Sequence, residues 1–262
     1  MNLPVEVIEA VKNDRCVIFV GNRATLEAAQ ETEADYPEQK ELARSLGWKK
    51  PAMAAGKQKG IVPSVEEGAE AYQAAKGRDA LVSYLGATVG AEAVKPLPAH
   101  RAIVKRFPLI FTTNYDDMLE RAAAEEGLAL DVIGRSSPIP ARAPGRVTLV
   151  HLRGALSRPD TMLVTRADAA RLPIAADTRK QLRTLLRQQV VLFVGYRPDE
   201  EEFERLFAEL SDAYGGELPR CHLAVAQGTI DDYQWQKWVW RGLLMFTADP
   251  SEVMTELEAS LR

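Results

Sequence analysis

Cysteine is scarce in this sequence, and long apolar runs are missing. The 262 residues include two cysteines, Cys16 and Cys221, which lie far apart and form no CxxC pair. A structural zinc module with four cysteine ligands is therefore excluded, and we expect no metal. Each cysteine stands at the edge of an apolar run, which predicts two buried, reduced thiols in strands.

No apolar run approaches the roughly 18 residues that a membrane-spanning helix needs. Residues 1–12 carry acidic side chains and lack the basic, apolar and small-residue order of a signal peptide. The net charge of −4 gives no electrostatic reason to expect nucleic-acid binding. We therefore expect a cytoplasmic protein with no membrane segment and no indication of a nucleic-acid partner.

Short apolar runs alternate with helical patterns along the chain. We expect strands at 16–20, 108–111, 128–133, 147–152, 190–194, 222–226 and 243–246. This alternation predicts an α/β fold, a parallel sheet with helices on both faces. A length of 262 residues suits one domain, 1–262. Between the first two strands, about 24–106 is mostly polar with short amphipathic faces, and we interpret it as a helical insertion that covers one side of the sheet.

The stretch Phe111-Thr112-Thr113-Asn114-Tyr115-Asp116 is the centre of the functional interpretation. It follows an apolar run and precedes apolar residues at helical spacing, so it predicts a strand, a polar turn and a helix. Open α/β sheets bind ligands at the carboxyl ends of their strands. The alternative is that Asn114 or Asp116 only caps the helix that follows.

Two other expected strands end in glycine, at Gly21 and Gly195. A buried strand followed at once by glycine is typical of a nucleotide-binding crossover, although each loop offers only one glycine. A further strand runs through His151 and leads to Arg153. Because these two residues are two apart, we expect them to share one face of that strand, where one of them could face the crevice.

Several segments together resemble the Sir2-like domains of bacterial defence proteins, over nearly the whole chain from Cys16 onward. The segments are the strand ending in Gly21, Thr112-Thr113-Asn114-Tyr115-Asp116, Leu152-Arg153-Gly154, Val164-Thr165-Arg166-Ala167-Asp168, and Val194-Gly195-Tyr196 with the acidic helix containing Phe203. The resemblance implies a Rossmann-like NAD-binding domain with a helical insertion after the first strand. In active relatives it implies hydrolysis of NAD to nicotinamide and ADP-ribose, which depletes NAD in the infected cell.

The resemblance also assigns roles to residues. Asn114 would orient the ribose or the attacking water, and Asp116 would hold the ribose hydroxyls or fix the turn, at a site that stabilises an oxocarbenium-like state. The expected NAD-binding residues are Gly21, Asn22, Arg23, Thr25, Thr112, Thr113, Gly195, Tyr196 and Arg197.

Three arginines depart from the family's pattern. Arg153 stands where relatives have the histidine that acts as base, Arg23 replaces a glycine, and Arg197 replaces a serine. Arginine stays protonated and cannot accept a proton. A fixed positive charge about 5 Å from a developing cation, at an effective dielectric of about 20, costs about 3 kcal/mol, on the order of a hundredfold in rate. The three arginines either pair with a pyrophosphate or fill the pocket, and His151 could partly substitute as the base.

Two functions follow from these observations. The first is an NAD hydrolase of antiphage defence that uses Asn114 and Asp116 with an unusual third group. The second is a catalytically inactive module that binds NAD, ADP-ribose or another nucleotide, or serves as an assembly partner. A homo-oligomer or a separate defence partner is expected, and the aromatic helix that carries Trp235 and Trp238 makes an interface plausible.

Overall fold

The computed structural model describes residues 3–46, 64–218, 221–226 and 230–262, and its centre is one seven-stranded sheet. The strand order is β3-β4-β2-β1-β5-β6-β7, and every neighbouring pair is parallel. The strands are β1 (Cys16–Val20), β2 (Leu109–Thr112), β3 (Ala129–Gly134), β4 (Arg146–His151), β5 (Val190–Val194), β6 (Cys221–Val225) and β7 (Leu243–Thr247). The predicted Rossmann-like parallel sheet is confirmed.

The central strands β1 and β5 are buried on both faces because they are apolar at every position. In β1, Ile18 and Val20 belong to one apolar cluster, whereas Val17 and Phe19 belong to another. This is the continuous hydrophobic pattern of a parallel strand that is covered on both sides. Both cysteines are buried in strands, Cys16 in β1 and Cys221 in β6.

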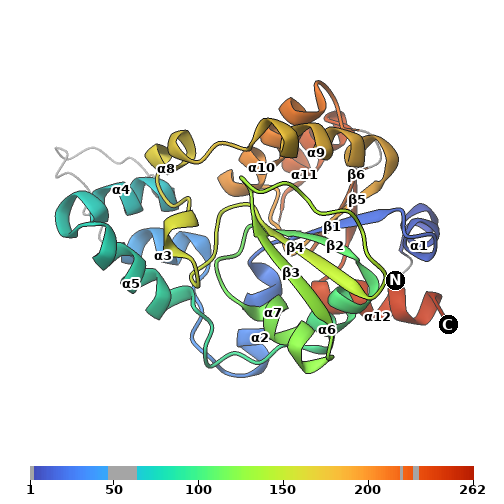
Figure 1. The fold of residues 1–262 in the computed structure, drawn as a ribbon, viewed down its shortest axis with the longest axis horizontal. Helices are drawn as coiled ribbons and strands as arrows, with labels where there is room; N and C mark the ends of the chain where they lie inside the picture. Colours follow the sequence, from blue (N-terminus) through green and yellow to red (C-terminus); the bar gives the residue numbers. More distant parts are fainter. Residues whose placement is uncertain (1–2, 47–63, 219–220, 227–229) are drawn as a thin grey trace.

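Helices cover the two faces of the sheet as separate groups (Figure 1). One face packs against α1 (Val5–Lys12), α2 (Arg23–Glu31), α6 (Pro98–Arg106), α7 (Met118–Glu125) and α12 (Pro250–Ser260). The other face packs against α9 (Ala176–Gln188), α10 (Glu201–Tyr214) and α11 (Asp232–Trp240). Trp238 of α11 is fully buried in this second cluster, so the aromatic helix contributes to the core.

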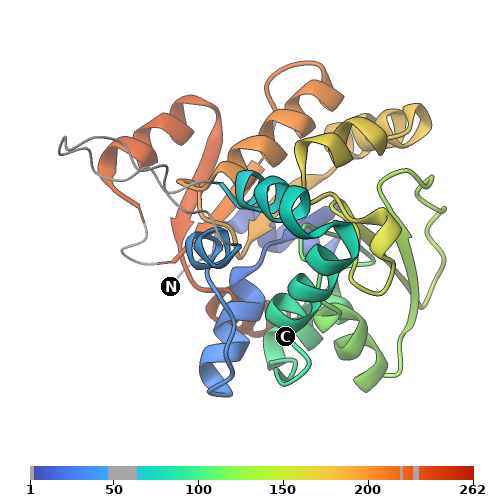
Figure 2. The ribbon, with the colours of Figure 1, turned by 90° about the vertical axis from the view of Figure 1, so that its left-hand side faces the viewer.

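A third group of helices stands beside the sheet, on the left of Figure 1 and toward the viewer in Figure 2. It contains α3 (Gln39–Ser45), α4 (Val65–Lys76) and α5 (Arg78–Val89), and next to them lie the short η1 (Pro159–Thr161) and α8 (Arg166–Arg171). The helices α3, α4 and α5 share an apolar cluster of their own with Met162 and Val164, which lie between η1 and α8. Of the predicted insertion, α2 and α6 thus pack on the sheet, while α3 to α5 stand apart from it. The limits of 24–106 for the insertion and 1–262 for one domain stay predictions.

No helix among the described residues is both long and apolar enough to cross a membrane.

The chain changes direction across the sheet between β1 and β5. After β1 it builds the side that ends in β3, and it then returns to the other side of β1 with β5. The chain therefore leaves β1 toward one edge of the sheet and leaves β5 toward the other edge. Open α/β sheets bind their ligands in the crevice at such a point. The loops after β1 and β5 are joined by hydrogen bonds from Gly21 N to Val194 O (2.9 Å) and from Arg23 N to Gly195 O (3.1 Å).

Glycine is required where these loops meet. A Cβ atom on Gly21 would lie 2.5 Å from the carbonyl oxygen of Gly195 and 2.7 Å from the ring of Tyr196. Gly195 itself has a φ of +77°, in the left-handed region that favours glycine. The two glycines thus allow the ends of β1 and β5 to come together beneath the ligand-binding edge.

We expect Gly21→Ala to lower the free energy of unfolding by about 1–3 kcal/mol, because backbone atoms would have to move to admit the methyl group. Urea denaturation measures this change. Gly134→Ala is the control, since a Cβ atom at Gly134 has no neighbour within 4 Å. Equal stability of the two variants would contradict the requirement for close contact at Gly21.

Candidate functional site

Asn114 is held at the carboxyl end of β2 by hydrogen bonds to β2 itself, to the β1–α2 loop and to α2. Its backbone N–H donates to Thr112 Oγ1 (3.0 Å), and its Nδ2 donates to Gly21 O (3.4 Å) and Thr25 Oγ1 (3.3 Å). Because the Gly21 carbonyl can only accept, these contacts fix which end of the amide faces the β1–α2 loop. Asn114 Oδ1 is buried and has no hydrogen-bond partner among the described residues.

Asp116 lies behind this turn and does not line the cavity described below. Its carboxylate accepts hydrogen bonds from Thr25 Oγ1 (2.9 Å), Tyr36 Oη (3.3 Å) and Met118 N (3.2 Å). Burial raises its pKa to about 6. Of the two roles expected for Asp116, the contacts match the one in which it fixes the turn.

His151, the last residue of β4, supports Asn114 from the sheet. Its Nδ1 lies 3.1 Å from Asn114 O, and its Nε2 lies 2.9 Å from Glu120 Oε1 on α7. Because the Asn114 carbonyl oxygen can only accept, Nδ1 is the donor in the first of these hydrogen bonds. The side chain is 1% exposed and does not line the cavity, whereas Arg153, beyond the end of β4, does. His151 and Arg153 therefore do not both face the cavity, as one shared strand face would have placed them.

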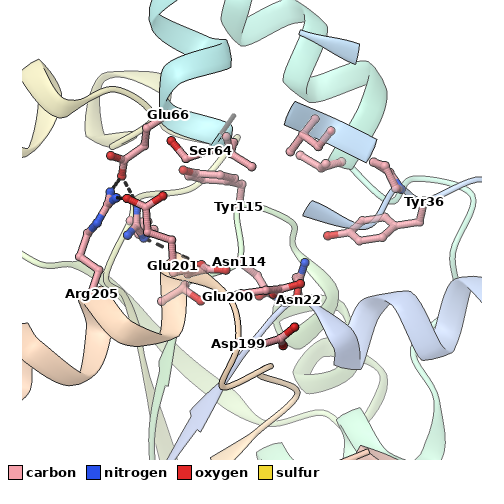
Figure 3. A pocket seen from close by; sticks show the side chains of 17 residues that line it. Asn22, Tyr36, Ser64, Glu66, Asn114, Tyr115, Asp199, Glu200, Glu201 and Arg205 are labelled. Carbon is pink, nitrogen blue, oxygen red and sulfur yellow. Dashed lines mark hydrogen bonds and ion pairs between the residues drawn. The ribbon is translucent and has the colours of Figure 1, made fainter. Parts of the chain in front are cut away.

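A cavity of about 230 Å³ lies at the carboxyl ends of the central strands, between the sheet and the α3–α5 group (Figure 3). Its floor includes Thr113 and Asn114. Its walls come from the β1–α2 loop, α4, the end of β4 and the first turns of α10. The lining residues are Asn22, Tyr36, Pro37, Leu42, Ser64, Val65, Glu66, Val89, Thr113, Asn114, Tyr115, Arg153, Asp199, Glu200, Glu201, Glu202 and Arg205.

Four of the predicted site residues line this cavity: Asn22, Thr113, Asn114 and Arg153. Five others lie behind them as supports: Gly21, Thr25, Thr112, Gly195 and Tyr196. Thr112 Oγ1 and Tyr196 Oη both donate to Val20 O, at 2.9 and 3.1 Å, and Thr113 Oγ1 donates to Tyr196 Oη at 3.2 Å. The supports therefore connect the ends of β1, β2 and β5.

The three arginines that depart from the family's pattern are each paired with carboxylates. Arg23 faces Glu38 at 3.9 Å and lies outside the cavity lining. Arg197 also lies outside it and forms two hydrogen bonds with Asp199, at 2.9 and 2.8 Å. Only Arg153 reaches the cavity, so the expectation that all three arginines gather in one pocket is not met.

Arg153 forms ion pairs with two cavity carboxylates. Its Nη1 lies 3.1 Å from Glu66 Oε1, and its Nε lies 3.9 Å from Glu202 Oε1. Burial lowers the pKa of Arg153, but Tyr115, Glu202 and Glu209 together raise it above its ordinary value, so the guanidinium stays charged. The repulsion that an isolated arginine would exert on a developing cation is therefore offset by its own partners.

Carboxylates outnumber guanidinium groups around the cavity, and the sequence did not reveal this. Five carboxylates, those of Glu66, Asp199, Glu200, Glu201 and Glu202, face two arginines, Arg153 and Arg205. The run from Asp199 to Glu202 reads in the sequence as the acidic first turn of a helix, which suits the helix dipole. Glu66 belongs to α4, whose position beside α10 depends on tertiary packing. An ion pair between Glu66 and Arg205 joins these two helices (Figure 3).

Two of these carboxylates have raised pKa values. Burial and the nearby charge of Glu202 raise the pKa of Glu200 to about 7, although Arg197 lowers it in part. Burial also raises the pKa of Glu202, against the lowering effects of Arg153 and of a hydrogen bond with Thr113. Glu200, a group that exchanges its proton near neutral pH, thus lines the same cavity as Asn114. Among the described residues, no group of three or more His, Cys, Asp or Glu side chains could hold a metal ion.

The fold is that of a Rossmann-like α/β protein, with a cavity at the point where its strand order reverses. The chain belongs to the family described as SIR2-like domain, whose model matches residues 108–241, just over half of the chain. The matched region contains the turn with Asn114, the end of β4 and the start of α10. No curated protein sequence matches the chain.

Solved structures of Sir2 proteins share the fold at low sequence identity. A Sir2 homologue in complex with NAD has a TM-score of 0.56 and 12% identity, over 100% of this chain and 94% of that one. A mutant Sir2 homologue in complex with ADP-ribose has a TM-score of 0.53 and 14% identity, over 99% and 97%. The likeness extends over the helical group beside the sheet as well as the sheet itself.

We expect Thr25→Val to lower the free energy of unfolding by about 1–3 kcal/mol. The substitution keeps the shape but removes an acceptor for Asn114 Nδ2 and a donor to the buried carboxylate of Asp116. Chemical denaturation measures the loss. Thr184→Val, on the exposed side of α9, is the control and should change stability by much less. A loss no larger than that of the control would show that the network does not hold the turn.

We expect Glu200→Gln to change how stability depends on pH. The folded pKa of Glu200 is about 7, above the ordinary 4.5. Between pH 4.5 and 7, Glu200 is ionised in the unfolded chain but protonated in the folded chain. Glu200 therefore lowers the free energy of unfolding of the wild type progressively from about pH 4.5 to 7, by on the order of 3 kcal/mol in total. Above pH 7 its contribution no longer changes. The variant escapes this loss of stability.

Unfolding in urea at several pH values tests the effect of Glu200. Glu200→Gln should match the wild type near pH 4 and exceed it in stability above pH 7. Glu204→Gln, on the same helix but outside the cavity lining, should run parallel to the wild type. A constant difference between Glu200→Gln and wild type at all pH values would exclude the raised pKa.

Proposed function

We propose that this protein binds NAD in the cavity and hydrolyses it to nicotinamide and ADP-ribose. The observation that carries this proposal is Asn114, whose Oδ1 is buried without a partner on the cavity floor, beside acidic side chains. An unpaired buried acceptor is unfavourable, and a hydroxyl or water of a bound ligand would satisfy it. The relatives with the same fold that were solved with NAD and with ADP-ribose support the choice of ligand.

The charges of the cavity suit the chemistry of this reaction. Nicotinamide leaves with the electron pair of its bond to the ribose, so positive charge develops on the ribose, as in glycoside hydrolysis. A carboxylate about 5 Å from that charge stabilises it by about 3 kcal/mol at an effective dielectric of about 20. Glu202 and Glu66 therefore oppose the repulsion from Arg153, to which both are paired.

The size of the cavity indicates which part of NAD it holds. Its volume of about 230 Å³ is below the roughly 300–1,000 Å³ of pockets for drug-sized ligands, so a whole dinucleotide would extend beyond it. The acidic walls favour the cationic nicotinamide and its ribose over the pyrophosphate. We infer that the nicotinamide riboside end enters the cavity and the adenylate lies outside it.

A second function is favoured by one specific observation, the presence of Arg153 where relatives have their histidine. In that case the domain binds NAD or ADP-ribose without cleaving it and acts through assembly. Tyr233 and Trp240 of α11 are 71% and 78% exposed, which supports an interface with a second copy or a defence partner. A role in antiphage defence follows from the family resemblance in either case.

We expect Asn114→Ala to abolish nicotinamide release from NAD by the purified protein. The substitution removes the group that orients the ribose or the water, while the supports behind it remain. Chromatographic measurement of nicotinamide, with wild type and Asn114→Ala side by side, tests this. Asn13→Ala is the control, because Asn13 only bonds the C-terminal end of α1.

Three outcomes separate the two functions. Release that depends on Asn114 supports the hydrolase. No release, together with a melting temperature that NAD or ADP-ribose raises, supports the binding module. Equal release by the wild type and Asn114→Ala would refute the assigned site.

A further inference from the structure

Hydrolysis of NAD requires a group that takes a proton from water, and neither expected residue supplies it. Arg153 stays charged and only donates hydrogen bonds. His151 is 1% exposed, and both of its ring nitrogens face acceptors outside the cavity. We propose that Glu202 accepts the proton of the attacking water and that Arg153 is the positioning residue that holds Glu202 in place. This inference rests on the proposed function.

The position of Glu202 suits this role. It belongs to the first turn of α10 and lines the cavity together with Asn114 and Arg153. Its side chain is 16% exposed, so a bound water can reach it although the bulk solvent is largely excluded. The contact with Thr113 places it against the residue that precedes Asn114. The proton acceptor and the orienting amide thus lie at the same part of the floor.

Arg153 holds Glu202 loosely and Glu66 tightly. The Arg153 Nη1 to Glu66 Oε1 distance of 3.1 Å is that of a hydrogen bond, whereas Nε to Glu202 Oε1 is 3.9 Å. At this distance the guanidinium attracts the carboxylate without forming a hydrogen bond to it, and Glu202 also has a hydrogen bond with Thr113. The positive charge of Arg153 favours the ionised carboxylate, the form that can accept a proton, and so opposes the effect of burial.

The other cavity carboxylates are less suited. Glu66 pairs with Arg153 and also with Arg205. Glu201 pairs with Arg205, and its side chain is 54% exposed. Asp199 is bound through both oxygens by Arg197.

Glu200 is the strongest competitor of Glu202, because burial raises its pKa as well. It lies toward Asn22 and Asp199 in Figure 3, on the side of the cavity where Arg197 binds Asp199. Its ion pair with Arg197 (3.7 Å) lies on that side, whereas Glu202 contacts Thr113, the residue next to Asn114.

The step balances without any further reactant. The water oxygen forms a bond to the ribose carbon as the bond from that carbon to the nicotinamide nitrogen breaks. The electron pair of the broken bond leaves with nicotinamide. The water proton moves to the Glu202 carboxylate and is then released to solvent. The acidic form of Glu202 is inactive, so the rate should rise with pH as the carboxylate ionises.

We expect Glu202→Gln to lower the rate of nicotinamide release by about 10²- to 10⁴-fold, because the amide cannot accept the proton. Nicotinamide is measured over a range of pH for the wild type, Glu202→Gln, Glu202→Asp and Glu200→Gln. Glu204→Gln, on the same helix but paired with Lys237, is the control and should match the wild type. Melting temperature with and without ADP-ribose shows that each variant folds and still binds.

Arg153→Gln tests the positioning role. Without the guanidinium, Glu202 should hold its proton more strongly, and the acidic limb of the pH profile should move upward by about one pH unit or more. Glu202→Asp should keep the acidic limb and a part of the wild-type rate. Glu202→Gln should have no acidic limb.

The outcomes distinguish this inference from the proposed function. Wild-type cleavage that Glu202→Gln lowers by less than threefold would overturn the inference and leave the hydrolase intact. A large loss in Glu200→Gln but not in Glu202→Gln would assign the proton to Glu200 instead. An unmoved acidic limb in Arg153→Gln would remove the positioning role. A wild type that releases no nicotinamide would overturn both proposals.

Discussion

The largely buried guanidinium of Arg153, 15% exposed, is the constraint on which the site depends. A charge with so little contact with water is tolerated only with carboxylate partners, and both partners come from other elements, Glu66 from α4 and Glu202 from α10. Satisfying Arg153 therefore brings the helical group beside the sheet against the start of α10. The same ion pairs close the cavity above Asn114, so one electrostatic requirement shapes both the packing and the chemistry.

A second network lies beneath the first and is made of neutral groups. The ends of β1, β2 and β5 are tied through hydrogen bonds from Thr112 and Tyr196 to Val20 O, and Thr25 connects Asn114 to Asp116. These hydrogen bonds hold the side-chain amide of Asn114 in one position. The sheet thus supplies rigidity at the floor, while the charged groups stand on the walls, where helices from distant parts of the chain meet.

The sequence predicts the sheet and the floor well, because both follow from local patterns. Apolar runs mark the strands to within a residue or two, and the carboxyl ends of parallel strands meet at one edge. Residues that immediately follow a strand, such as Thr113 and Asn114, can therefore be placed together from sequence alone. The walls could not be placed in this way. Glu66 belongs to a helix far from the strand ends in sequence, and its approach to Arg153 depends on how α4 packs.

The same limit explains the different positions of His151 and Arg153. Alternation along a strand predicts a shared face only while the strand continues, and β4 ends at His151. Beyond that point the chain turns, so Arg153 reaches the cavity while His151 stays under Asn114. The resemblance that aligns Arg153 with the histidine of relatives thus concerns a residue that lines the cavity, whose chemistry depends on the groups around it.

The chemistry of such a position depends on the charges around it as much as on the residue itself. Replacing a histidine by arginine adds a permanent positive charge at the cavity, which alone would oppose a cationic transition state. Here the arginine is accompanied by carboxylates that exceed it in number, so the cavity as a whole carries negative charge. A cavity of this kind can stabilise positive charge on a ribose, and it needs a proton acceptor only within reach of the water. A carboxylate held near, but not against, a guanidinium meets that need. An arginine at this position is therefore compatible with the proposed hydrolysis in a way that the residue alone would not suggest.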